Sequence, residues 1–145
     1  MVQDGPATCY FFEDLNEGEF ASFAKKVTDA DIVKYAEISG DTNPIHLDAE
    51  YAATTMFKER IAHGILTAGL ISAAFGTQMP GPGSIYVNQM LKFKAPVKIG
   101  DTVTATVTVT GKLPEKKFVT FSTVCKIGDT VVLDGEATLM VPTKG

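Results

Sequence analysis

The sequence predicts a single domain of the α+β class, in which an antiparallel sheet packs around one apolar helix. Before about residue 80 the apolar residues have helical or mixed spacing, and after it short strands alternate with turn signals. Residues 64–76 are apolar all round, which is typical of a helix that is covered on every side. The chain has 145 residues, 45% of them hydrophobic, which is enough for one core and too little for two.

The chain should begin with a strand followed by a capped helix. Residues 20–27 alternate loosely and predict the strand. Thr28 and Asp31 then have the spacing of a capping box, which predicts a helix start. An amphipathic pattern follows, and Gly40 should end the helix.

Beyond Gly40 we expect a break before the next helices. Residues 40–47 should be irregular, because Pro44 lacks a backbone donor and pushes Asn43 out of helical geometry. A short helix is expected near residues 48–55. The apolar run from residue 64 then predicts the central helix.

The second half of the chain should supply the sheet. In residues 102–110 threonines alternate with apolar residues, a period of two that predicts a strand with one buried face. Similar strands are expected in residues 85–93, 119–127 and 131–141, separated by turns that contain glycine or proline. Such a sheet leaves a threonine-rich edge that could pack on a second subunit, so we expect a homodimer.

Composition excludes several classes of protein. With 17 acidic and 13 basic residues the net charge is -4, which argues against a nucleic-acid partner with a broad basic face. The longest apolar run would form a helix of about 20 Å, too short to cross a bilayer. The first six residues carry no cationic region followed by an apolar stretch, so we expect no secretory signal and a cytoplasmic protein. Cys9 and Cys125 lack metal or redox spacing and should be incidental thiols.

Asp41 and His46 are the first candidate for chemistry. They are five residues apart, a separation that places them on different faces of a regular helix or strand. The bend at Asn43 and Pro44 could bring carboxylate and imidazole together on one small molecule, where they could exchange protons. Alternatively, Asp41 forms an Asx-turn with the backbone, and His46 is a core or surface histidine whose hydrogen bonds are satisfied. The spacing alone favours this alternative. No third ligand stands at metal spacing, so we expect no zinc site.

A second candidate lies at the start of the apolar helix. The free N–H groups of its first turn could polarise a carbonyl oxygen held against Gly64. An equally good interpretation is that Gly64 serves only to allow tight packing at the helix start and that His63 is a hydrogen-bond donor at the helix end. The helix face formed by Gly64, Ala68 and Ser72 offers a groove for an acyl chain, and Phe75 could close its far end.

Two segments carry a specific resemblance to a known family. Residues 39–48 (SGDTNPIHLD) and 57–66 (FKERIAHGIL) resemble the hydratase motif of the MaoC-like dehydratase family, and in particular its short, single-domain R-specific enoyl-CoA hydratases. Residues 83–86 and 93–97 are also typical of that group. The resemblance runs from about residue 20 to residue 141. It implies one hot dog domain over residues 1–145, with 1–18 as an N-terminal extension, and a homodimer with active sites near the subunit interface.

The resemblance also implies a function. Asp41 and His46 would be the catalytic pair that holds the attacking water, and the Gly64 amide would contact the thioester oxygen. Asn43 would take part in substrate binding. The reaction implied is the reversible addition of water to a short-chain trans-2-enoyl-CoA, giving an R-3-hydroxyacyl-CoA. It needs no metal or redox cofactor, and the acyl-CoA is the substrate. Polyhydroxyalkanoate precursor supply, β-oxidation within fatty acid metabolism, and carboxylate assimilation are the candidate roles that the resemblance implies.

Two other functions share this fold and remain alternatives. A hot dog thioesterase would hydrolyse the thioester and release free thiol. A non-catalytic module would bind acyl-CoA or acyl-carrier protein without turnover, although the intact Asp41 and His46 pair argues against it. Acyl length, the choice between CoA and carrier protein, and the pathway are not fixed by the sequence.

Overall fold

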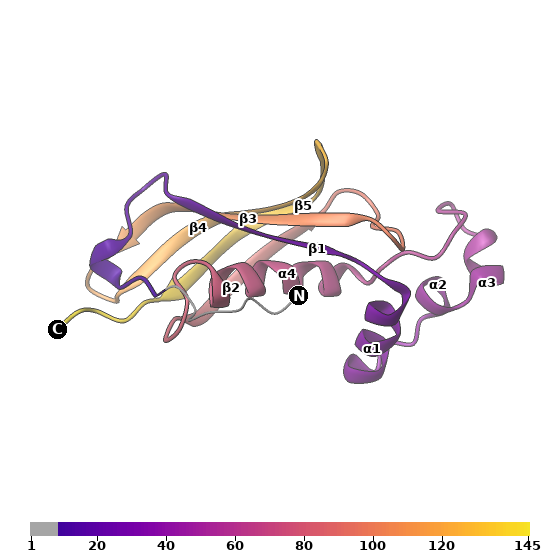
Figure 1. The fold of residues 1–145 in the computed structure, drawn as a ribbon, viewed down its shortest axis with the longest axis horizontal. Helices are drawn as coiled ribbons and strands as arrows, with labels where there is room; N and C mark the ends of the chain where they lie inside the picture. The colour runs from indigo at the N-terminus through magenta and orange to yellow at the C-terminus, as the bar shows by residue number, and fades with distance from the viewer. Residues whose placement is uncertain (1–8) are drawn as a thin grey trace.

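The computed structural model describes residues 9–145 and confirms the predicted α+β fold. One antiparallel sheet has the strand order β1-β3-β4-β5-β2. The strands are β1 (Phe20–Lys26), β2 (Ile85–Phe93), β3 (Thr102–Leu113), β4 (Phe118–Ile127) and β5 (Thr130–Met140). The helices are η1 (Phe12–Asp14), α1 (Asp29–Ser39), α2 (Pro44–Leu47), α3 (Ala49–Ala53) and α4 (Gly64–Thr77). Helix α4 lies along one face of the sheet, and α1, α2 and α3 gather beyond one end of it (Figure 1).

The core lies between α4 and the inner face of the sheet. In β3 the alternate residues Val103, Ala105, Val107 and Val109 are buried, as the period of two predicts. The facing side of α4 contributes Leu70, Ile71, Ala74 and Phe75. The strands β2, β4 and β5 lie within one residue of the ranges that the sequence pattern predicts.

The expectation that α4 is covered on every side is wrong for the single chain. The side chain of Ile65 is 55% exposed, and Gly69, Ser72 and Gly76 are exposed on the same helix. One sheet can cover only one side of a helix, so the opposite face of α4 is open in the single chain.

The segment after α1 is more regular than expected. Thr28 and Asp31 form the predicted reciprocal cap of α1, and Gly40 ends that helix with a φ of 81°. Residues 44–47, expected to be irregular, instead form α2. Pro44 occupies its first position, where the missing N–H has no helical partner to lose, and the Asn43 side chain accepts from the Ile45 N–H at 3.1 Å.

Part of the expected N-terminal extension packs on the core. Phe12 and Leu15 are buried, and the Tyr10 N–H donates to the Pro80 carbonyl at 2.8 Å. Residues 1–8 of that extension lie outside the described residues. Within residues 9–145, every helix falls short of the length and apolar character that crossing a membrane requires.

Candidate active site

Asp41, His46 and His63 come together at the helical end of the molecule. Asp41 follows the C-cap of α1, His46 lies on α2, and His63 is the N-cap of α4. A carboxylate oxygen of Asp41 and one ring nitrogen of each histidine all lie within 4.8 Å of one another. The bend at Asn43 and Pro44 thus brings Asp41 and His46 together, although regular structure would separate them.

Asp41 has two carboxylate oxygens with different surroundings. Its Oδ1 accepts the Asn43 N–H at 3.2 Å, which is the Asx-turn that the alternative interpretation predicts. The residue is exposed, so the carboxylate can still reach a ligand. The turn and a chemical role are therefore compatible, because the turn occupies one oxygen and fixes the direction of the other.

His46 is buried and held in one tautomer. Its Nδ1 lies 2.8 Å from the Ile61 carbonyl, which can only accept, so Nδ1 carries the proton and Nε2 is a bare acceptor. Burial lowers the pKa of His46 from its usual 6.5, and nearby His63 lowers it further; the bond to Ile61 and the charge of Asp41 oppose these effects. The imidazole is therefore neutral at physiological pH.

The spacing of Asp41 and His46 suits one water molecule. Two hydrogen bonds of about 2.8 Å that meet at a water oxygen span roughly 4.5 Å between their acceptors. An Asp41 carboxylate oxygen and a ring nitrogen of His46 lie no more than 4.8 Å apart, and the span of a bridging water falls within that limit. Both groups are acceptors, so one water could donate to each.

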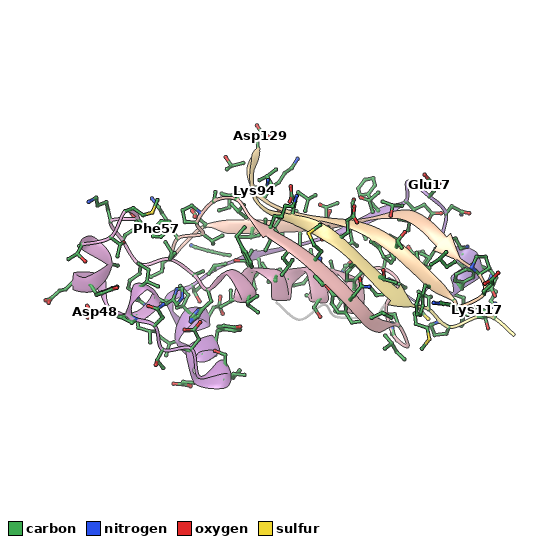
Figure 2. The ribbon with its side chains drawn as sticks, turned by 180° about the vertical axis from the view of Figure 1, so that it is seen from behind. Glu17, Asp48, Phe57, Lys94, Lys117 and Asp129 are labelled. Carbon is green, nitrogen blue, oxygen red and sulfur yellow. The ribbon has the colours of Figure 1, made fainter. Side chains whose placement is uncertain are left out.

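Gly64 and His46 line the same cavity, of about 540 Å³. As the first residue of α4, Gly64 has an N–H with no partner inside the helix. The Phe93 ring packs directly on it, since a Cβ built on Gly64 would lie 2.5 Å from Phe93 Cε1. Phe57 and Lys94 also line the cavity, and Figure 2 shows Phe57 at the end of the molecule that carries Asp48.

The residues expected to form the acyl wall do not line one cavity. Ala68 lines a second cavity of about 370 Å³ between α4 and β2. Ser72 is exposed, and neither cavity includes it. Phe75 is 2% exposed and packs in the core, 4.8 Å from Phe121 between ring centroids. Each step of four residues turns the side-chain direction by about 40°, so a face begun at Gly64 drifts away from the cavity.

Asn43 acts locally in this structure. Its side-chain oxygen caps α2, and neither cavity includes it.

Two residues that contact the site, Arg60 and Phe93, were not singled out from the sequence. The Arg60 Nε donates to the His46 carbonyl at 2.6 Å, and its Nη2 lies 2.7 Å from Asp29. Both contacts join segments far apart in the chain, which local patterns do not reveal.

The cluster is poorly arranged for a metal ion. The rings of His46 and His63 stack with centroids 3.8 Å apart and 29° between their planes. An imidazole lone pair lies in the plane of its ring, so two stacked rings do not direct their lone pairs to one point. Among the described residues this is the one group of ligand type close enough to consider.

Comparison with known proteins shows which family the chain belongs to. The family model described as "MaoC like domain" matches residues 17–131. An (R)-specific enoyl-CoA hydratase of Rhodospirillum rubrum is 63% identical over 94% of each chain. A 3-hydroxybutyryl-CoA dehydratase of Methylorubrum extorquens is 51% identical over 92% of this chain and 85% of its own.

The same relationship holds in three dimensions. The solved structure described as "(R)-hydratase from A. caviae involved in PHA biosynthesis" superposes with a TM-score of 0.86 and 42% identity, over 90% of this chain and 99% of that one. The sheet wrapped on α4 is therefore a hot dog fold. The matches in sequence and in fold agree, and the chain belongs to the family of MaoC-like domain proteins.

Proposed function

We propose that the protein is an R-specific enoyl-CoA hydratase, a hydro-lyase that adds water reversibly to trans-2-enoyl-CoA and forms R-3-hydroxyacyl-CoA. The observation that carries this proposal is the pairing of an exposed Asp41 carboxylate with a neutral His46, beside a cavity that also exposes Gly64. The names of the two close relatives, a hydratase and a dehydratase, describe the two directions of one such reaction.

The geometry supports a mechanism that uses one water and no other reactant. The water donates one hydrogen bond to the Asp41 carboxylate and one to His46 Nε2, which leaves an oxygen lone pair facing C3 of the substrate. As the O–C3 bond forms, the Asp41 and His46 pair takes one proton, and the electrons of the C2=C3 bond move toward the thioester carbonyl. The Gly64 N–H stabilises the charge on that oxygen, and the pair returns a proton to C2. Because the titrations of Asp41 and His46 are coupled, the acceptance of the proton is assigned to the pair and not to either residue.

The proposal includes no redox cofactor, because hydration transfers protons and leaves no net oxidation. It includes no metal, because the stacked rings of His46 and His63 do not direct their lone pairs to one point. The substrate is an acyl-CoA of short chain length. Support for short chains is the name of the 3-hydroxybutyryl-CoA relative. Fatty acid metabolism and the supply of polyhydroxyalkanoate precursors are the two candidate roles, the second supported by the A. caviae structure.

We also propose a homodimer, which buries the open edge strand β2. The threonine-rich edge expected from the sequence is not available, because β3 lies inside the sheet between β1 and β4. Strand β2 is an edge strand, and Ile85, Val87, Met90 and Phe93 on it are each at least 43% exposed. The exposed face of α4 adjoins it across the second cavity. Two copies that join here would cover both faces. Sedimentation should show a dimer that Met90→Lys weakens, and a monomer at micromolar concentration would contradict it.

A cytoplasmic location completes the proposal. The free thiols of Cys9 and Cys125 suit a reducing compartment. Cell fractionation would test this, and recovery of the protein outside the cytoplasm would contradict it.

One assay separates the proposed function from its rivals. The protein is mixed with a short trans-2-enoyl-CoA, and enoyl absorbance, free thiol and product chirality are followed together. Loss of enoyl absorbance without thiol release, with the R product, is the expected result. Thiol release from a saturated acyl-CoA would indicate a thioesterase, and saturable binding without turnover would indicate a binding module.

A further inference from the structure

His63 contacts both members of the proposed catalytic pair at once. Its Nε2 lies 3.0 Å from the Asp41 carbonyl oxygen, and its ring stacks on His46 with centroids 3.8 Å apart. The residue is 2% exposed and directly precedes Gly64 as the N-cap of α4. The Tyr35 ring packs against it from α1, with centroids 4.6 Å apart. One side chain thus joins the backbone of Asp41, the ring of His46 and the start of the central helix.

The tautomer of His63 follows from these contacts. A carbonyl oxygen only accepts, so Nε2 carries the proton and Nδ1 is a bare acceptor. Nδ1 is buried and has no hydrogen-bond partner among the described residues. A buried polar atom without a partner is costly and uncommon, and it calls for an explanation other than packing.

We infer that His63 is a positioning residue for the hydration, one that fixes the Asp41 backbone through its Nε2–H and the His46 ring by stacking. This inference rests on the proposed function. Without the bond to its carbonyl, Asp41 can shift with the loop that follows Gly40. Without the stack, the His46 ring keeps only the Nδ1 bond to Ile61 to set its orientation. A displacement of about 1 Å at a reacting group can cost roughly 100-fold in rate.

A second consequence concerns the protonation of His46. Asp41 faces it from the loop after α1, His63 from the N-cap of α4, and Arg60 bonds its carbonyl from the segment before α4. Of these, His63 lowers the pKa of His46 and Asp41 raises it, while burial has the largest lowering effect. Replacing His63 removes one lowering effect, so the pKa of His46 should rise; in His63→Ala the entry of water should raise it further.

Three substitutions separate the two contacts. His63→Gln retains an amide N–H able to reach the Asp41 carbonyl but loses the ring. His63→Phe keeps a ring to stack on His46 but loses the donor. His63→Ala loses both. Glu115→Gln, in the exposed β3–β4 turn at the end of the sheet remote from α1, is the matched control.

The experiment measures hydration kinetics and the His46 titration in folded protein, as judged by circular dichroism. We expect His63→Ala to lose about 100-fold in kcat with little change in KM, and each single-contact variant to lose about tenfold. The chain has two histidines, so His63→Phe leaves His46 as the only imidazole resonance to titrate by NMR. Its pKa should rise, and the acid limb of the kcat profile should move to higher pH with it.

Two outcomes would overturn the inference. One is a kcat within about twofold of wild type in folded His63→Ala. The other is a loss of kcat with no change in the His46 titration, which would assign His63 a structural role only. Failure of the proposed function is distinguishable, since the wild-type protein itself would then leave enoyl-CoA unchanged while the NMR titration could still be read.

Discussion

Gly64 and Phe93 are in such close contact that a methyl group on the glycine would lie 2.5 Å from the aromatic ring. The atoms in contact belong to the Phe93 side chain and not to the backbone, so the ring can shift away from a methyl group. Gly64→Ala should therefore fold, at a cost of about 1–3 kcal/mol, because the ring must move away from the new methyl group.

A double-mutant cycle checks this contact. If the Phe93 ring causes the cost, Gly64→Ala should destabilise the Phe93→Leu protein less than the wild type, because the smaller side chain leaves space. Urea unfolding of the four proteins gives the coupling free energy. Additive effects would show that Gly64 is constrained by something other than Phe93.

The lowered pKa of His46 predicts how activity depends on pH. Burial keeps the ring neutral below its usual pKa of 6.5, so kcat/KM should hold its plateau at pH 6.5 and fall only as the pH drops through the lowered pKa. Initial rates across this range, at constant ionic strength, provide the measurement. An acid limb centred above 6.5 would contradict the prediction.

The same shift affects stability with a definite sign. Between the lowered pKa of the folded state and about 6.5, the unfolded chain binds more protons at His46 than the folded chain does. The free energy of unfolding should therefore decrease as the pH falls through that window. His46→Gln should lose this part of the pH dependence, and an unchanged slope would contradict it.

Arg60 and Asp29 should differ in importance although they pair with each other. Arg60→Ala leaves the buried His46 without a donor to its carbonyl, which should cost about 1–3 kcal/mol and also reduce kcat. The Asp29 side chain is 60% exposed, so Asp29→Ala should cost at most about 1 kcal/mol. Urea unfolding and kinetics of both variants test this, and equal losses would argue against the Arg60 bond to His46.

Phe75 should matter for folding more than for chain length. Its ring is buried among Phe121 and Tyr86, so Phe75→Ala should lower the free energy of unfolding by about 3–5 kcal/mol. Phe75→Leu is the milder control. Because Phe75 lines neither cavity, the chain-length profile of Phe75→Leu should match that of the wild type. A shift of the profile toward longer acyl chains would contradict this prediction and show that Phe75 lines the acyl-binding site.

The features that sequence predicted best are local ones. The capping box of Thr28 and Asp31 and the alternation of β3 depend on neighbours a few residues away, and both appear in the structure. The segment before His46 was less predictable, because Pro44 both breaks a helix from within and begins one at its first position. Its regular form follows from the Asn43 cap.

The candidate site was only partly predictable. Asp41 and His46 could be named because they stand close together in a motif. His63 lies 22 residues from Asp41 in the chain, and the sequence suggested for it only the role of a helix-end donor. The acyl wall was placed by helical spacing alone, which does not indicate how α4 is rotated against the sheet. In the structure the rotation of α4 places Phe75 in the core and Ser72 on the exposed face.

The hydration rate of Asp41→Asn and His46→Ala, on a short trans-2-enoyl-CoA, tests the account most directly. Each substitution removes a proton acceptor. Asp41→Asn should change the packing little, because Asp41 is exposed, and His46→Ala should change it modestly. Each variant should keep its circular dichroism spectrum and lose about 10²–10⁴-fold in kcat. Rates near wild type in both would contradict the assignment of this pair as the group that activates water.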